Sequence, residues 1–185
     1  ALDFEGLYPS IMMAHNLCYS TLVIDPKYDN VAGVKYESFV IEGKTYKFAQ
    51  DVPSLLPPIL EELKAFRKQA KKDMAKATGQ MKQVYNGKQL AYKVSMNSVY
   101  GFTGATVGQL PCVAIASSTT SYGRELLFQT KSFVERTYTK ENGYAHDADV
   151  VYGDTDSVMV RFGPRDIGAS MELAEKAADE VSNIF

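Results

Sequence analysis

Hydrophobic and polar positions alternate in two stretches of the chain in a way that is typical of β-hairpins. Residues 34–48 combine β-branched and aromatic side chains with a turn at residues 42–43. Residues 150–162 repeat the pattern with a turn at residues 153–156. Residues 1–4 predict one further short, buried strand, so the sequence predicts short strands joined by tight turns.

Elsewhere apolar positions recur every three or four residues, which is the spacing of helices that pack on one face. Helices are expected over about residues 9–16, 57–78, 81–100, 113–138 and from 169 onward. The expected buried positions of the second helix are Ile59, Leu63, Phe66, Ala70 and Met74. Gly79 breaks that helix and Gly101 is expected to stop the next one, so the two form an antiparallel hairpin. Hairpin strands with packed helices give the fold class α+β.

The composition is that of a folded protein, but its charges are unevenly distributed. The 185 residues are 45% hydrophobic and 23% charged, and no apolar run approaches the roughly 18 residues of a membrane span. The net charge is −2, yet residues 64–93 carry nine basic residues and one acidic residue, which leaves −10 for the rest. A basic element beside an acidic body suggests a polyphosphate partner that is brought to a carboxylate site. Cys18 and Cys112 are isolated, so we expect reduced thiols of an intracellular protein.

Three aspartates carry the strongest chemical signal. Asp154 and Asp156 lie two residues apart at the tip of an apolar hairpin, where they repel each other unless a cation lies near them. Asp3 ends a separate apolar strand. Two-metal phosphoryl-transfer sites need carboxylates that converge from separate strands, so these residues are candidate metal ligands. Taken singly, each aspartate also fits an ordinary solvent-exposed turn.

The predicted two-helix hairpin supplies candidate partners for phosphate groups. Arg67 and Lys71 are four residues apart and share a face of the first helix. Lys93, Asn97 and Tyr100 share a face of the second helix. Counted from the break between the helices, Arg67 lies roughly 18 Å and Lys93 roughly 21 Å along its helix, so the two sit nearly level. They are placed to grip one triphosphate, unless they only form the solvated faces of two amphipathic helices.

Three motifs run from Asp3 to Ile11 (DFEGLYPSI), from Lys93 to Gly101 (KVSMNSVYG) and from Tyr152 to Ser157 (YGDTDS). In this order they resemble the motifs of the family B DNA polymerases, and of the delta-type replicative group in particular. The delta-type likeness comes from residues 12–19 and 102–105. Two positions depart from the pattern. Gly6 stands where the family usually has serine, which is expected to loosen the turn, and Met96 replaces a smaller residue in the expected fingers.

The resemblance implies the architecture of a polymerase palm, an antiparallel sheet with packed helices, into which a two-helix fingers subdomain is inserted. Residues 1–56 would form the first part of the palm, 57–100 the fingers and 101–185 the second part of the palm. The family's amino-terminal, exonuclease and thumb domains have no counterpart in this stretch. The chain is therefore expected to be an internal fragment of a larger polymerase, weakly active or inactive alone.

By the same resemblance, the aspartates would bind two Mg²⁺ ions, or Mn²⁺ in their place. Asp3 and Asp156 would bridge both metals, and Asp154 would support the site. The backbone carbonyl of Phe4 would complete one coordination shell. One metal would lower the pKa of the primer 3′-hydroxyl, and the other would neutralise the triphosphate and the leaving pyrophosphate. Lys93 would protonate the pyrophosphate as it leaves.

The resemblance also implies how the incoming nucleotide is held. Its triphosphate would contact Arg67, Lys71, Lys93, Asn97 and the backbone amides of Gly6 and Leu7. Tyr8 would stack beneath the sugar and exclude a 2′-hydroxyl, which selects deoxynucleotides. Tyr100 and Gly101 would face the nascent base pair. His15 receives no role and is expected to be structural.

The implied reaction is template-directed addition of deoxynucleotides to a primer 3′-hydroxyl, with release of pyrophosphate. The partners would be primer–template DNA and deoxynucleoside triphosphates, with a sliding clamp and accessory subunits bound by other parts of the parent, and no membrane. The protein would work in the nucleus, or at a viral replication site in the nucleus or cytoplasm of a host.

Two other interpretations stay open. A glycosyltransferase could use Asp154 and Asp156 to hold the metal of a nucleotide sugar, but this leaves the Lys93 face and Tyr8 unexplained. A non-catalytic palm-like scaffold has no need to keep all three aspartates. Incorporation of deoxynucleotides distinguishes the polymerase from both.

Overall fold

The chain forms two compact units. The computed structural model describes residues 1–105, 107–108 and 110–185. The first unit consists of Ala1–Leu7 and Tyr122–Phe185, and the second of Tyr8–Ser121. Helix α4 (Val113–Thr137) carries the chain from the second unit into the first. Antiparallel sheets and packed helices confirm the α+β class.

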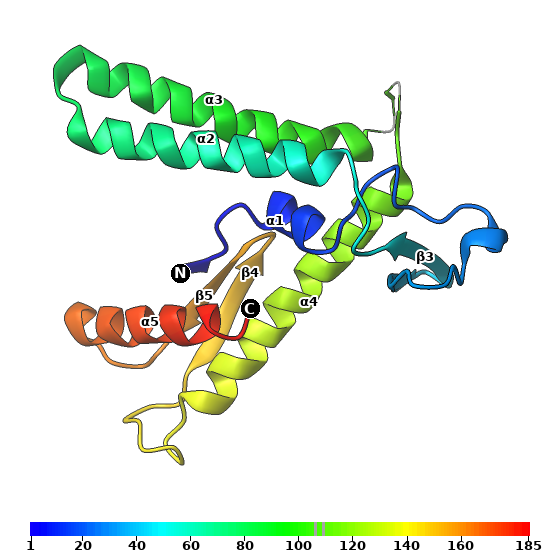
Figure 1. The fold of residues 1–185 in the computed structure, drawn as a ribbon. Helices are drawn as coiled ribbons and strands as arrows, with labels where there is room; N and C mark the ends of the chain where they lie inside the picture. Colours follow the sequence, from blue (N-terminus) through cyan, green and yellow to red (C-terminus); the bar gives the residue numbers. More distant parts are fainter. Residues whose placement is uncertain (106, 109) are drawn as a thin grey trace. The chain divides into compact units, whose positions relative to one another are not determined.

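A three-stranded antiparallel sheet in the order β1-β5-β4 lies at the centre of the first unit (Figure 1). Its strands are β1 (Leu2–Asp3), β4 (Asp149–Asp154) and β5 (Ser157–Arg161). The second part of α4 and helix α5 (Ile167–Ser182) supply half of the buried residues of the unit's core, and the segments that flank the sheet supply the others. The buried residues are Val134, Tyr138, Ala148, Phe162, Ala177 and Val181, with Leu2 and Val160 of the sheet packed against them. Removing this apolar surface from water holds the helices on the sheet.

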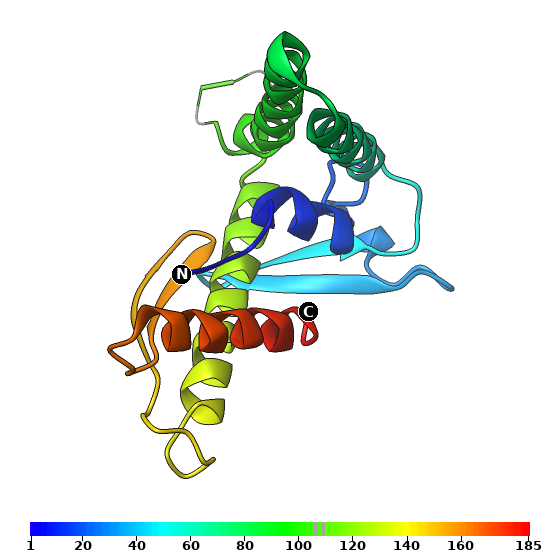
Figure 2. The ribbon, with the colours of Figure 1, turned by 90° about the vertical axis from the view of Figure 1, so that its left-hand side faces the viewer.

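The second unit contains a two-stranded sheet and the helical hairpin (Figures 1 and 2). Its elements are α1 (Leu7–Ala14), the 3-10 helix η1 (Pro26–Tyr28), β2 (Tyr36–Ile41), β3 (Lys44–Ala49), α2 (Leu56–Lys76), α3 (Gly79–Gly104) and the first part of α4. Helices α2 and α3 run antiparallel beside each other in both views, as the short connection between them predicts.

Both predicted hairpins are present. The turn between β2 and β3 has φ +50° at Glu42 and +78° at Gly43, the left-handed pair that suits a tight two-residue hairpin turn. Strand β4 extends through Asp154, two residues further than the sequence predicts, so the second turn contains only Thr155 and Asp156. Thr155 also adopts a positive φ, +50°. A non-glycine residue in this region is uncommon, and here it closes the turn that carries two aspartates.

The helices correct three expectations, two about their boundaries and one about a buried face. Gly101 does not stop α3, which continues to Gly104. Of the residues expected on the buried face of α2, Ile59 and Phe66 are about half exposed, whereas Leu60, which was not expected there, is fully buried. Helix α1 begins at Leu7, two residues earlier than expected. Among the described residues, no helix combines the length and the apolar character needed to cross a bilayer.

Candidate active site

The sheet of the first unit brings the candidate carboxylates to one end of β5. Asp3 pairs with Ser157 from one side and Asp154 pairs with the same residue from the other. Residues opposite each other in antiparallel strands project to the same face. Asp3, Ser157 and Asp154 therefore share a face, with the Cα atoms of the two aspartates roughly 10 Å apart.

Asp156 is joined to the first strand by a backbone hydrogen bond. The N–H of Phe4 donates to the carbonyl of Asp156 at 2.8 Å, which places the third aspartate beside the end of β1. The Thr155 hydroxyl donates to Oδ1 of Asp154 at 3.0 Å. Ladder pairing and the two-residue turn thus hold Asp154 and Asp156 on the same short sheet edge as Asp3, although about 150 residues separate them in the sequence.

These carboxylates have the chemistry of a hard-cation site. Asp3 and Asp154 are exposed, and Asp156 is half-buried. Within the part of the chain that the structure describes, no Lys, Arg or His side chain forms an ion pair with any of the three. Carboxylate and carbonyl oxygens are the ligands that Mg²⁺ prefers, so the donor set fits that ion. The described residues contain no group of three or more His, Cys, Asp and Glu side chains already arranged to hold a metal.

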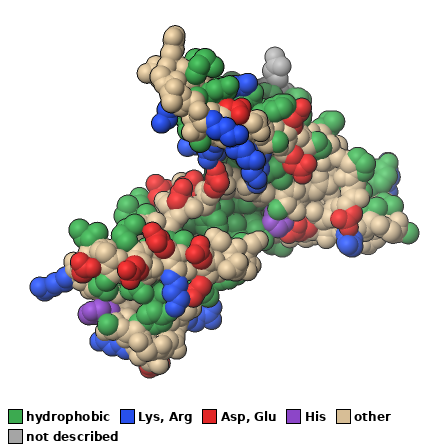
Figure 3. Space-filling view, turned by 60° about the vertical axis from the view of Figure 1, so that its left-hand side comes forward, with side chains coloured by type: hydrophobic (Ala, Val, Ile, Leu, Met, Phe, Trp, Pro, Cys, Tyr) green, Lys and Arg blue, Asp and Glu red, His purple; other side chains and the backbone are tan. Residues whose placement is uncertain are grey.

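The helical hairpin of the second unit carries the candidate phosphate ligands. Lys and Arg side chains gather on it in the space-filling view (Figure 3). The rings of Phe66 and Tyr92 meet at 5.6 Å between centroids and fix the register of α2 against α3. Phe66 precedes Arg67 and Tyr92 precedes Lys93. Arg67 and Lys93 therefore lie at nearly the same height along the hairpin, which agrees with their similar distances in residues from the break between the helices.

Side-chain exposure differs among these candidates. Lys71, Lys93 and Asn97 are exposed, and Arg67 is half-buried. The Arg67 Nε–H donates to Oε1 of Gln89 across the hairpin at 3.5 Å. Positively charged groups on an exposed helical face can reach a polyanion without losing much hydration beforehand.

Tyr8 and Tyr100 meet within the second unit. Their ring centroids lie 4.4 Å apart, with the planes tilted by 42°. Both side chains are half-buried. Burial, and to a smaller extent the neighbouring Tyr8 hydroxyl, raise the pKa of Tyr100 above its ordinary value. Tyr100 therefore stays neutral at physiological pH, as a flat ring in a partly desolvated position.

The glycine that departs from the family pattern occupies a left-handed position. Gly6 has φ +64°, a conformation in which a side chain with a Cβ is strained. Glycine therefore adopts this turn without strain, which the sequence alone did not reveal. At Gly101, inside α3, an added Cβ would meet nothing within 4 Å, so this side of the helix is open. Met96 is buried in the same helix.

Three other expectations concern residues outside these groups. Cys18 and Cys112 are free thiols, as expected. Burial opposes ionisation of Cys18, but hydrogen bonds from Ser20 and from the amides of Leu55 and Leu56 outweigh it and lower its pKa. Nδ1 of His15, the residue after α1, lies 2.7 Å from Oε2 of Glu37 in β2.

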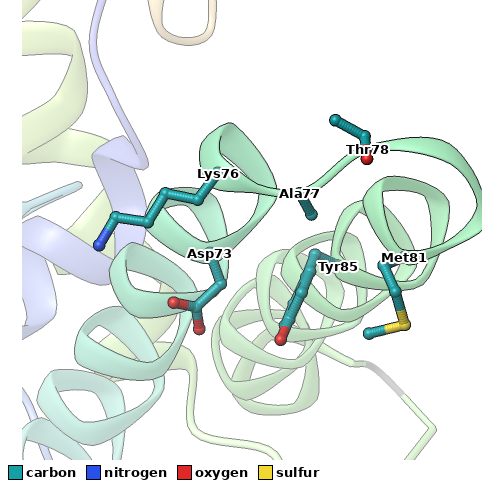
Figure 4. A pocket seen from close by; sticks show the side chains of 6 residues that line it. All are labelled: Asp73, Lys76, Ala77, Thr78, Met81 and Tyr85. Carbon is teal, nitrogen blue, oxygen red and sulfur yellow. The ribbon is translucent and has the colours of Figure 1, made fainter.

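A shallow hollow of about 430 Å³ lies at the closed end of the helical hairpin (Figure 4). Its lining residues are Asp73, Lys76, Ala77, Thr78, Met81 and Tyr85. None of them belongs to the motifs. Asp73 is six residues beyond Arg67, roughly 9 Å along α2, so the hollow is separate from the candidate phosphate ligands.

Sequence reasoning missed Gln89. It is one of only a few buried polar residues in the described part of the chain, with 8% of its surface exposed. Its position four residues before Lys93 puts it on the same helical face as Lys93 and Asn97. This spacing was the available signal, but a lone glutamine in a polar helix resembles an ordinary surface residue.

Comparisons with known proteins agree with the motifs. The sequence model of DNA polymerase family B matches residues 1–185. The DNA polymerase delta catalytic subunits of Candida albicans, Schizosaccharomyces pombe and Bos taurus are 51%, 52% and 52% identical over all of this chain. The chain spans only 18%, 17% and 17% of their lengths.

The fold has a solved counterpart as well. The family B DNA polymerase from the archaeon Pyrobaculum calidifontis superimposes with a TM-score of 0.68 at 25% identity. The match covers 96% of this chain and 21% of that one.

Proposed function

Because this chain belongs to DNA polymerase family B, and to its delta-type group, we propose that it carries the nucleotidyl-transfer chemistry of a replicative DNA polymerase. It would add deoxynucleotides to a primer 3′-hydroxyl under the direction of a template and release pyrophosphate. The observation that supports this most directly is the β1-β5-β4 sheet edge, where aspartates from separate strands flank Ser157. Two-metal phosphoryl transfer requires such an arrangement.

The acidic residues would hold the divalent cations. Asp3 and Asp156 would each contact both ions, the backbone carbonyl of Phe4 would add one oxygen, and Asp154 would support the edge. When bound, Mg²⁺, or Mn²⁺ in its place, would favour ionisation of the 3′-hydroxyl and offset the negative charge of the triphosphate. The ladder bonds that fix β1 against β5 hold these oxygens on a rigid scaffold.

Residues of the hairpin and of the first motif would bind the triphosphate. The basic side chains are Arg67, Lys71 and Lys93, with Asn97 as a neutral donor. Arg67 would act as a planar fork and the lysines as point charges. Lys93 would also give a proton to the departing pyrophosphate. The amides of Gly6 and Leu7 would donate to phosphate oxygens, for which the left-handed turn at Gly6 leaves space free of a Cβ.

The aromatic residues would select the sugar and base. Tyr8 would lie beneath the deoxyribose and exclude a 2′-hydroxyl. The tilted contact with Tyr100 supports this assignment because it limits the movement of the Tyr8 ring. Tyr100 and Gly101 would lie against the nascent base pair, and the open space at Gly101 is compatible with a flat ligand.

Residues 1–56 and 101–185 would form the palm and residues 57–100 the fingers. These proposed subdomains differ from the two compact units, because the second unit includes the hairpin together with α1 and the β2-β3 sheet. Primer–template DNA and deoxynucleoside triphosphates would be the substrates. A sliding clamp and accessory subunits would bind other parts of the protein, which would work inside the cell, in the nucleus or at a viral replication site.

Incorporation of labelled deoxynucleotides on a primed template by the full-length protein tests the proposal. Asp156→Ala should severely reduce incorporation at the Mg²⁺ concentration that saturates the wild-type protein, because one proposed ligand of both metals is lost. Asp149→Ala is the matched control, since Asp149 lies in the same sheet and pairs with Arg161 at 2.9 Å instead. Normal incorporation by Asp156→Ala would contradict the proposal.

A further inference from the structure

Gln89 is a buried amide in a helix whose surroundings are largely solvated. Only 8% of its surface is exposed, whereas the next residue, Leu90, is 45% exposed although it is apolar. Burying an amide without hydrogen-bond partners costs about 1–3 kcal/mol in proteins. A buried glutamine between two long helices therefore needs partners, and its partners indicate what it does.

Both ends of the Gln89 amide are engaged. Its Oε1 accepts from the Nε–H of Arg67 on α2 at 3.5 Å. Its Nε2 donates to Oδ1 of Asn86, one turn earlier on α3, at 3.0 Å. The bond to Asn86 orients the amide so that its oxygen faces the guanidinium, the only arrangement in which both contacts are made.

The hairpin packing keeps these two residues at the same level. The Phe66–Tyr92 ring contact lies directly beside them, with 5.6 Å between centroids. Ala70 is 3% exposed and, being small, allows the helices to approach closely. Arg67 is thus anchored at Nε by a residue whose own position is set by the helix–helix interface.

We propose that Gln89 is a positioning residue that orients Arg67 toward the triphosphate. This inference rests on the proposed function. The Nε–H is the guanidinium donor that an end-on phosphate fork does not use, so the bond to Gln89 fixes the plane of the group without occupying either terminal nitrogen. Arginine side chains have many rotamers, and fixing one of them before the nucleotide arrives lowers the entropic cost of binding.

The length of the contact fits a positioning role. At 3.5 Å the hydrogen bond is at the long end of the range and contributes little by itself. Such contacts shorten when the ligand draws the participating groups into place. Gln89 also shares a helical face with Lys93 and Asn97. One face of α3 would therefore both orient Arg67 of α2 and supply two residues that bind the triphosphate.

Steady-state kinetics of Gln89→Met in the full-length protein tests the inference. Methionine keeps the volume and the apolar stem but removes the acceptor. We expect KM for the deoxynucleoside triphosphate to rise about three- to tenfold, the effect of one long, weak hydrogen bond, with kcat nearly unchanged. Gln83→Met, an exposed glutamine on the same helix, should leave both constants unaltered.

A double-mutant cycle separates positioning from a packing defect. In an Arg67→Ala background, Gln89→Met should have no further effect on KM, because the side chain that Gln89 orients is gone. Equal effects in both backgrounds would mean that the hairpin is merely loosened, and would overturn the inference. An active enzyme with a raised KM in Arg67→Ala but an unchanged KM in Gln89→Met would overturn it while leaving the proposed function intact. Absence of incorporation by the wild-type protein would instead reject the proposed function, and the inference with it.

Discussion

At the scale of single residues, the Tyr8–Tyr100 contact leads to a prediction about sugar selection. The rings lie 4.4 Å apart, so removal of the Tyr8 ring opens space and frees Tyr100 at the same time. In Tyr8→Ala, we expect incorporation of ribonucleotides relative to deoxynucleotides to rise by up to about a hundredfold, the scale on which a pocket rejects one added hydroxyl. Competing ribo- and deoxynucleotide substrates in a primer-extension assay measure this ratio.

Tyr8→Phe is the control for that experiment, because it keeps the ring and removes only the hydroxyl. It should discriminate against ribonucleotides as the wild-type protein does. Unchanged discrimination in Tyr8→Ala would show that another residue excludes the 2′-hydroxyl.

A second residue-scale prediction concerns Arg67. Its replacement by alanine should remove one proposed charge-assisted contact to the triphosphate, worth about 1.5–3 kcal/mol. KM for the nucleotide should therefore rise roughly ten- to a hundredfold, with a smaller change in kcat. Lys68→Ala removes a neighbouring charge from a different face of α2 and should have little effect. If KM in Arg67→Ala does not move, this arginine belongs to a solvated helix face only.

At the scale of elements, a hydrogen bond joins the residue that follows α4 to α5. The hydroxyl of Tyr138, which is 1% exposed, donates to Oε2 of Glu180 at 2.8 Å. Burial, and then the Glu180 carboxylate, raise the pKa of Tyr138 far above its ordinary value. The contact therefore stabilises the fold fully below the pKa of an unfolded tyrosine, about 10, and loses its effect as pH rises toward the folded pKa.

Tyr138→Phe should accordingly loosen the packing of α5. A loss of about 1.5 kcal/mol corresponds to roughly tenfold faster hydrogen exchange in α5 amides that exchange through opening of this contact. The advantage of the wild-type protein should be constant up to about pH 10 and decline above it. Mass spectrometry of the two proteins at matched pH measures the ratio, with Tyr152→Phe, an exposed tyrosine of the same unit, as control. A ratio that increases above about pH 10 would contradict the assignment.

The element boundaries show what a sequence can and cannot predict. The β2-β3 hairpin was predictable because Glu42 and Gly43 specify its turn locally. The end of α3 was not, since a glycine in a helix costs only about 1 kcal/mol and tertiary packing overrides it. Thr103, two residues beyond Gly101, is 1% exposed, and its hydroxyl donates to the carbonyl of Tyr100. These contacts continue the helix past the expected stop.

The same distinction holds for the candidate site. Asp3, Asp154 and Asp156 were identifiable because carboxylates at the ends of apolar strands are costly to hold close together unless a cation offsets their repulsion. Gln89 was not, because its burial results from the pairing of α2 with α3, and helical periodicity of one segment contains no information about its neighbour. Thr155 likewise shows a positive φ that its residue type does not favour.

At the scale of the whole molecule, the net charge of −2 is the sum of a basic segment, residues 64–93, and an acidic remainder of the chain. The carboxylates belong to the first compact unit, and the basic hairpin belongs to the second. The proposed metal ligands and the proposed basic ligands of the triphosphate therefore belong to different units. Substitutions in one group should alter the dependence on its own ligand much more than the dependence on the other.

The dependence of activity on Mg²⁺ tests that separation and the roles of the three aspartates together. Loss of a residue that only supports a metal ligand typically weakens metal binding ten- to a hundredfold, so loss of a direct ligand should cost at least about tenfold. Asp154→Asn should therefore raise the half-saturating Mg²⁺ concentration about ten- to a hundredfold, and Asp3→Asn and Asp156→Asn should raise it further. Asp149→Asn, in the same sheet, should leave it unchanged. An equal shift in Asp154→Asn and Asp156→Asn would mean that both carboxylates of the turn bind metal directly, because only a direct ligand is expected to have the larger effect.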